Sequence, residues 1–151
     1  MGQHITANLR SVALVGHGAA GKTTLAETLL ATTGTITSRG AIEKGNTVCD
    51  FDPQEKELRH SINSAIVGFN WLDYHIHLVD TPGFPDFAGQ AIGALAAVDT
   101  AVIVINAQNG IELNTERMMK AAAARKLCRM IVINKIDADN VDLPKLLANI
   151  R

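Results

Sequence analysis

The sequence of 151 residues predicts an α/β domain with a mostly parallel, doubly wound sheet. Short apolar runs typical of strands alternate with segments whose apolar residues recur at helical spacing. Such an alternation implies right-handed βαβ units, which bring the carboxyl ends of the parallel strands to one edge of the sheet. A glycine-rich loop and two short polar motifs each follow a strand run, so we expect a ligand site at that edge.

The first half of the chain predicts a strand, a helix, an irregular segment and a hairpin. Residues 9–15 form an apolar run, and residues 24–30 carry a helical apolar stripe. Residues 32–59 lose all periodicity and exceed the usual length of a structureless loop, which favours a nucleotide-sensing switch over an ordinary surface insertion. Residues 62–71 and 74–79 predict an antiparallel pair, which adds one antiparallel strand to the edge of the sheet.

The second half continues the strand and helix alternation. Apolar residues at helical spacing predict a helix over 87–98 and another over 113–125. Continuous apolar runs predict buried strands at 101–105 and 130–133. A last helix is expected over 142–150, with an aspartate cap and a proline in its first turn.

Composition narrows the class of protein. Hydrophobic residues make up 47% of the chain, which is enough for one domain with its own core. A net charge of −1 gives no electrostatic case for nucleic-acid binding, and we expect no direct contact with DNA. Cys49 and Cys128 are far apart in the sequence and have no metal-binding spacing, which is typical of reduced thiols in a cytoplasmic protein. No apolar run approaches the roughly 20 residues of a membrane span.

A phosphate-binding loop follows the first predicted strand and fits the P-loop pattern G-x-x-x-x-G-K-[ST]. Its residues are Gly16, His17, Gly18, Ala19, Ala20, Gly21, Lys22 and Thr23, followed by Thr24. The glycines allow successive amide groups to turn inward around a phosphate. Lys22 can place its charge on the β- and γ-phosphates, and the Thr23 hydroxyl can bind Mg²⁺. The domain is therefore predicted to be a P-loop NTPase.

A second motif, Asp80-Thr81-Pro82-Gly83, ends the second strand of the predicted hairpin. An aspartate at a strand tip beside a P-loop can hold Mg²⁺ directly or through water. The Gly83 amide can approach a γ-phosphate, so its surroundings can report whether that phosphate is present.

A third motif, Asn134-Lys135-Ile136-Asp137, follows the predicted strand at 130–133. The Asp137 carboxylate can accept hydrogen bonds from the N1–H and the exocyclic amine of guanine, whereas adenine offers it no such pair of donors. Lys135 can lie over the P-loop, and Asn134 can tie the two loops together. Together the motifs predict binding of GTP and GDP with Mg²⁺.

With these motifs the chain resembles the G domain of translational GTPases, most closely elongation factor G and its paralogues, over nearly its whole length. Residues 16–24 are similar to the family's G-H-x-x-A-G-K-T-T, and residues 80–87 to D-T-P-G-H-x-D-F. Residues 50–57 resemble its acidic first switch, and residues 98–111 the stretch that leads to N-K-x-D. The resemblance implies GTP hydrolysis triggered on the ribosome, where the full-length protein drives or assists translocation or recycling.

The chain departs from the family pattern at three positions. The family has a histidine that orients the attacking water where this chain has Phe84, and a phenyl ring cannot make that hydrogen bond. Ser61 stands where a family threonine contacts Mg²⁺ and the γ-phosphate, and Ala19 replaces an aspartate. His60 and His17 are candidate substitutes for the missing histidine, although His17 already matches a family histidine.

The resemblance also implies that residues 1–151 are an incomplete G domain, without the final strand, the S-A-x base loop and later domains. We expect such a fragment to be monomeric or weakly self-associating and to hydrolyse GTP slowly. Three hypotheses stay open: a GTPase that uses Lys22 and Gly83, a nucleotide-gated ribosome-binding switch with little hydrolysis because of Phe84, and an ATPase in which residues 134–137 are accidental.

Overall fold

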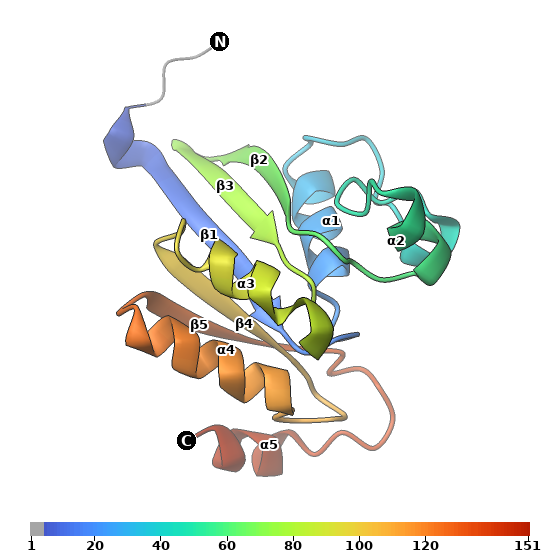
Figure 1. The fold of residues 1–151 in the computed structure, drawn as a ribbon, viewed down its shortest axis with the longest axis vertical. Coiled ribbons are helices and arrows are strands. Elements are labelled where there is room, and N and C mark those ends of the chain that lie inside the picture. Colours follow the sequence, from blue (N-terminus) through green and yellow to red (C-terminus); the bar gives the residue numbers. More distant parts are fainter. Residues whose placement is uncertain (1–4) are drawn as a thin grey trace.

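The computed structural model describes residues 5–151, which form a five-stranded sheet with helices on both faces (Figure 1). The strands are β1 (Leu9–Gly16), β2 (Ala65–Trp71), β3 (Tyr74–Asp80), β4 (Thr100–Asn106) and β5 (Cys128–Asn134). Their spatial order is β2-β3-β1-β4-β5. β1, β3, β4 and β5 are parallel, and β2 pairs antiparallel with β3 at one edge. The predicted fold class is confirmed.

Apart from α2, which lies in the segment predicted to be irregular, the helices follow the strands in the predicted order, and the helix predicted over 87–98 is shorter than expected. They are α1 (Lys22–Thr32), α2 (Pro53–Leu58), α3 (Ala88–Ala94), α4 (Leu113–Ala124) and α5 (Leu143–Ile150), with 3₁₀ turns η1 (Thr6–Asn8), η2 (Ile42–Lys44) and η3 (Pro85–Phe87). Asp142 caps α5 by accepting a hydrogen bond from the Lys145 amide at 3.0 Å, as the sequence predicts. Within residues 5–151, none of the helices is both long and apolar enough to pass through a bilayer.

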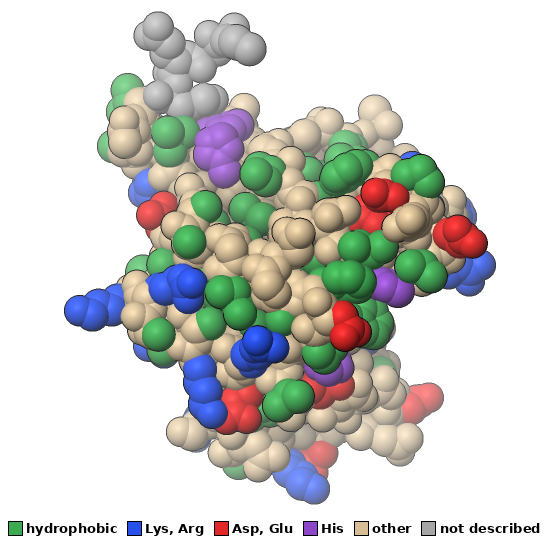
Figure 2. All heavy atoms as spheres, viewed as in Figure 1, with side chains coloured by type: hydrophobic (Ala, Val, Ile, Leu, Met, Phe, Trp, Pro, Cys, Tyr) green, Lys and Arg blue, Asp and Glu red, His purple; other side chains and the backbone are tan. Residues whose placement is uncertain are grey.

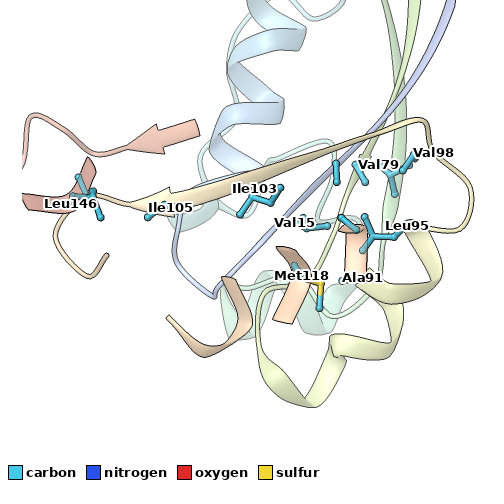
Figure 3. Packing of buried hydrophobic residues seen from close by; sticks show 13 residues of the cluster. Val15, Val79, Ala91, Leu95, Val98, Ile103, Ile105, Met118 and Leu146 are labelled. Carbon is cyan, nitrogen blue, oxygen red and sulfur yellow. The ribbon is translucent and has the colours of Figure 1, made fainter. Parts of the chain in front are cut away.

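The core has two parts, one on each face of the sheet, because successive side chains of a strand point to opposite faces. Val15 and Ile103 belong to the part covered by α3, α4 and α5, where Leu95 and Met118 pack against them (Figure 3). Leu14 points to the other face and packs with side chains of α1 and with Cys49. The sheet is thus held between two helical layers, and its loops are positioned from both sides.

The structure corrects three expectations about burial and strand length. The strand predicted at 130–133 is not buried: Met130 is 56% exposed and Ile131 is 36% exposed, because β5 lies at an edge of the sheet and pairs only with β4. The helical spacing of Leu146, Leu147 and Ile150 predicts one buried face for the last helix, but Leu147 of α5 is exposed. β2 begins at Ala65 instead of residue 62.

Residues 33–64 contain little regular structure, yet buried carboxylates order them. Glu27 of α1 is fully buried and accepts hydrogen bonds from the backbone amides of Gly40, at 2.9 Å, and Val48. A Cβ at Gly40 would collide with the backbone of Asn46 and Thr47, so only glycine fits here. One helical side chain therefore fixes two distant points of this segment onto α1.

Glu55 organises the end of the same segment. It is 1% exposed, and its carboxylate accepts hydrogen bonds from the amides of Asp52 at 3.1 Å and of Ile62 and Asn63 at 2.9 Å each. Glu55 and Asp52 also form a capping box that starts α2. Because Ile62 and Asn63 give their amides to Glu55, the residues between α2 and β2 are held beside the P-loop.

Candidate functional site

A cavity of about 580 Å³ opens at the carboxyl edge of the sheet. The P-loop, the start of α1, the segment that links α2 to β2 and the loop after β3 form its walls. The lining residues are Gly18, Ala19, Gly21, Lys22, Thr23, Thr24, Ile42, Glu43, Leu58, Arg59, His60, Ser61, Thr81, Gly83, Phe84 and Lys135. Its size suits a small-molecule ligand. Hydrophobic side chains reach the surface over α2 in Figure 2. Among the lining residues, Leu58 is 54% exposed.

The P-loop backbone needs glycine at two positions. Gly16 has φ of 142°, and a Cβ there would collide with the carbonyl oxygen of Val104. Gly21 has φ of 92°, and a Cβ there would collide with the side chain of Asn134. Both glycines thus allow the loop to pack against the ends of neighbouring strands while α1 begins at Lys22.

Lys22 is the cation at the base of this loop. It is 5% exposed, and its Nζ donates to the carbonyl oxygen of His17 at 2.7 Å and, at 3.4 Å, to that of Gly16. Burial lowers the pKa of Lys22 to about 8, although the nearby carboxylates of Asp80 and Glu112 act to raise it. An anion in the cavity would give this ammonium a stronger partner than a carbonyl.

A polar cluster connects Thr23, Ser61, Asp80 and Asp50. The Thr23 hydroxyl donates to Asp80 Oδ2 at 2.6 Å and lies 3.2 Å from the Ser61 hydroxyl, which donates to Asp50 Oδ1 at 2.7 Å. Asp80 is 1% exposed, and burial raises its pKa to about 7 in spite of the Thr23 hydrogen bond and Lys22. Its Oδ1 is buried and has no hydrogen-bond partner among residues 5–151.

This donor set fits Mg²⁺. A buried carboxylate oxygen without a partner lies beside two hydroxyls, and Mg²⁺ is usually held by one or two carboxylates together with hydroxyls, waters and substrate phosphates. Within the described part of the chain, no group of three or more His, Cys, Asp or Glu side chains could hold a metal ion by itself. Thr23, Ser61 and Asp80 are therefore suited to a metal that also binds a ligand in the cavity.

The loop after β3 packs directly onto the P-loop. A Cβ at Gly83 would overlap Lys22 Nζ and the backbone of His17 and Gly18, so this position requires glycine. The side chain of Asn114, at the start of α4, donates to the Gly83 carbonyl oxygen at 2.7 Å. The Phe84 ring, 37% exposed, lies against Gly18 on the cavity wall.

The loop after β5 reaches the P-loop from the other side. The Asn134 side chain donates to the Ala20 carbonyl oxygen at 2.9 Å, and Lys135 lines the cavity. Asp137 lies on the exposed turn that follows and is not among the described residues that line the cavity. The structure thus brings the three motifs to one edge but leaves Asp137 apart from the cavity wall.

His17 is not among the described residues that line the cavity. Its Nε2 lies 3.5 Å from Glu112 at the start of α4, and its Nδ1 is buried with no hydrogen-bond partner within residues 5–151. His60 instead lines the cavity, next to Ser61. Of the two candidate histidines, His60 is therefore the one found on the cavity wall among the described residues.

Sequence reasoning assigned no individual role to four cavity residues: Ile42, Glu43, Leu58 and Arg59. All four lie in the aperiodic segment, where neither helical nor strand spacing marks a wall of the site. Two signals pointed to it, namely its length and the capping-box pattern from Asp52 to Glu55.

Comparison with known proteins identifies relatives of this arrangement. The family model described as the elongation factor Tu GTP binding domain matches residues 7–151. Elongation factor G 2 of Streptomyces coelicolor is 38% identical over 143 residues, which cover 95% of this chain and 21% of that protein. The mitochondrial ribosome-releasing factor 2 of Anopheles gambiae is 37% identical over 142 residues, or 94% of this chain and 19% of that protein.

Two further similarities agree with these. The tetracycline resistance protein TetO of Streptococcus mutans is 36% identical over 134 residues, which cover 89% of this chain and 21% of that protein. A crystal structure of a protein from Thermus thermophilus superposes with a TM-score of 0.92 at 39% identity, covering 96% of this chain and 22% of the other. The chain thus spans about a fifth of the length of the curated relatives it matches.

Proposed function

This chain belongs to the family of elongation factor Tu GTP-binding domains, and from that premise we propose that it binds GTP and GDP with Mg²⁺ and hydrolyses GTP as part of a translation factor similar to elongation factor G. The supporting observation is the meeting of three motifs at one cavity. Asn134 holds the P-loop at Ala20, Thr23 bonds to Asp80, and Gly83 packs on Lys22. Each contact joins two different motifs, so the motifs act as one site.

In this proposal Thr23, Ser61 and Asp80 hold Mg²⁺, with the unpartnered Asp80 Oδ1 facing it directly or through water. A bound Mg²⁺ would neutralise charge on the β- and γ-phosphates. The residues of the chain do the rest of the electrostatic work. The P-loop amides, Lys22 and the Gly83 amide donate to the phosphate oxygens on which negative charge increases in the transition state.

The reaction is the transfer of a phosphoryl group from GTP to water. The water oxygen forms a bond to the γ-phosphorus, the bond from that phosphorus to the β–γ bridging oxygen breaks, and GDP leaves with the electron pair. The two products are GDP and inorganic phosphate, and the water proton ends on the phosphate or in solvent. The site lowers the barrier by orientation and charge stabilisation, because it offers the phosphorus no nucleophile of its own.

Asp137 supplies the choice of base. Its carboxylate accepts from the N1–H and the exocyclic amine of guanine, while adenine would leave it without those donors. The position of Asp137 supports this assignment, because it lies on the exposed turn two residues after Lys135, which lines the cavity.

The partner of the full-length protein is the ribosome, and the compartment is the cytoplasm. The names of the relatives support the ribosome as the partner, since they include an elongation factor and a ribosome-releasing factor. By itself the 151-residue chain hydrolyses GTP slowly and is a monomer or associates weakly through the exposed β5 edge.

Single-turnover hydrolysis of GTP by the full-length protein, with and without ribosomes, tests the enzymatic proposal. We expect ribosomes to raise the rate by at least about tenfold. Binding of GTP with no acceleration by ribosomes would instead support the competing hypothesis of a nucleotide-gated switch, which Phe84 motivates. The family membership favours the hydrolysing form.

A further inference from the structure

We propose that His60 orients the attacking water in this site, in the place of the histidine that Phe84 replaces. The inference rests on the proposed GTP hydrolysis and assigns one more residue to it. His60 follows α2 closely, lines the cavity and precedes Ser61, whose hydroxyl is part of the proposed Mg²⁺ site. His60 therefore lies on the cavity wall, next to the proposed Mg²⁺ site.

The His60 ring lies against Phe84. The two ring centroids are 4.6 Å apart at an interplanar angle of 57°, and the Phe87 centroid lies 6.3 Å from that of His60. Phe84 in turn rests against Gly18, where a Cβ would come within 3.2 Å of the ring. The small residue in the P-loop, the phenyl ring and the imidazole thus form consecutive layers along one wall of the cavity.

The backbone around His60 is held from both sides. The amide of His60 donates to the Glu55 carbonyl oxygen at 3.2 Å, and the amides of Ile62 and Asn63 donate to the Glu55 carboxylate. Ser61 is tied to Asp50 at 2.7 Å. A residue that must orient a water molecule benefits from this support, because small displacements weaken catalysis strongly.

The hydrogen bond of the ring selects its tautomer. Nδ1 of His60 lies 3.0 Å from the Leu58 carbonyl oxygen, which can only accept, so Nδ1 carries the proton. In the neutral ring Nε2 is then left with a lone pair, which is the acceptor that a water molecule needs. Phe84 has no such atom, and His17 lies 3.5 Å from Glu112 and is not among the described residues that line the cavity. His60 is thus the histidine on the cavity wall that can take this role.

In the reaction, Nε2 of His60 accepts a hydrogen bond from the water and directs its oxygen lone pair at the γ-phosphorus. The new phosphorus–oxygen bond forms as the bond to the bridging oxygen of GDP breaks. The proton is released to the phosphate product or to solvent, and His60 ends the cycle unchanged. The contact with Phe84 helps to hold the His60 ring in place.

The test is single-turnover GTP hydrolysis by the full-length protein with ribosomes, together with GDP affinity. His60→Phe keeps an aromatic ring against Phe84 but removes Nε2, whereas His60→Gln keeps a side chain that can accept a hydrogen bond. His77→Phe is the matched control, because His77 is exposed on β3 and its ring contacts His75 instead. We expect His60→Phe to lower the single-turnover rate of GTP hydrolysis at saturating ribosome concentration by about 100-fold, and to lower GDP affinity by less than about twofold. His60→Gln should lose less of this rate, and His77→Phe should lose none.

The double variant His60→Phe with Phe84→His separates water orientation from packing. We expect the double variant to hydrolyse GTP at least about tenfold faster than His60→Phe, because the histidine at position 84 restores a hydrogen-bond acceptor on the same wall of the cavity. The proposal is overturned if His60→Phe hydrolyses GTP at the wild-type rate, if rate and GDP affinity fall together, or if the double variant recovers nothing. If wild type and all variants bind GTP but none hydrolyses it, the proposed hydrolysis itself fails, and the role of His60 fails with it.

Discussion

The Glu55 carboxylate offers the sharpest test of how the segment before β2 is ordered. It accepts hydrogen bonds from three backbone amides, those of Asp52, Ile62 and Asn63, and Glu55 is only 1% exposed. Glu55→Ala leaves those three donors without their partner. At about 1.5–3 kcal/mol for each hydrogen bond to a charged group, the gross loss is about 4.5–9 kcal/mol. Relief of the cost of burying a carboxylate and entry of water offset part of it. We expect the free energy of unfolding to fall by about 2–4 kcal/mol.

The assay is urea denaturation of the 151-residue chain followed by circular dichroism, with amide hydrogen exchange on the same variants. Glu57→Ala is the control, since Glu57 lies on the same short helix and is exposed. We expect the control to change stability by less than about 0.5 kcal/mol. Exchange of the Ile62 and Asn63 amides should accelerate at least about tenfold in Glu55→Ala. If both the stability and the exchange at these two amides are unchanged, the Glu55 carboxylate does not order the segment before β2.

The other predictions concern the loops and the thiols. Asn134→Ala leaves the buried Ala20 carbonyl without its hydrogen-bond donor, and we expect GDP affinity, measured by calorimetry, to fall about 5- to 150-fold. An unaltered affinity would mean that the P-loop and the loop after β5 do not depend on this contact. Asp80→Asn should remove most of the gain in GDP affinity that Mg²⁺ gives, a gain that would persist if Asp80 had no part in holding the metal. Burial, with help from neighbouring carboxylates, raises the pKa of the Cys49 thiol far above its usual range, whereas Cys128 is exposed. A thiol reagent should therefore modify Cys128 within minutes and Cys49 only on unfolding. Rapid modification of both thiols in the native chain would contradict this.

Most of the fold follows from local patterns that sequence reasoning can detect. The run before Gly16, the stripe of α1 and the alternation of strands and helices each reflect burial against one sheet, which produces periodicity. The position of a strand within the sheet produces no periodicity in the sequence. Met130 and Ile131 belong to an apolar run, yet β5 lies at an edge, and only the spatial order of the strands decides their exposure.

In the candidate site, too, some parts were predictable from the sequence and others were not. Its three motifs were predictable because each has a defined spacing that fits one chemical task. The length of residues 32–59 indicated a switch and the family resemblance pointed to Ser61, but the conformation of residues 33–64 was not predictable, because buried carboxylates order it. In a sequence Glu27 and Glu55 look like ordinary solvated charges, and their amide partners are up to 21 residues away in the chain. The same cause moves the start of β2 to Ala65, since Ile62 and Asn63 donate to Glu55 instead of to a neighbouring strand.

The proposed function depends on selection of guanine nucleotides together with Mg²⁺. Calorimetric titration of the 151-residue chain with GDP and with ADP, each with and without Mg²⁺, measures this selection. We expect GDP to bind, Mg²⁺ to strengthen its binding, and ADP to give no detectable heat at the same concentrations. If ADP binds as tightly as GDP, Asp137 has no role in recognising the base, and the proposal of a guanine-nucleotide site is wrong.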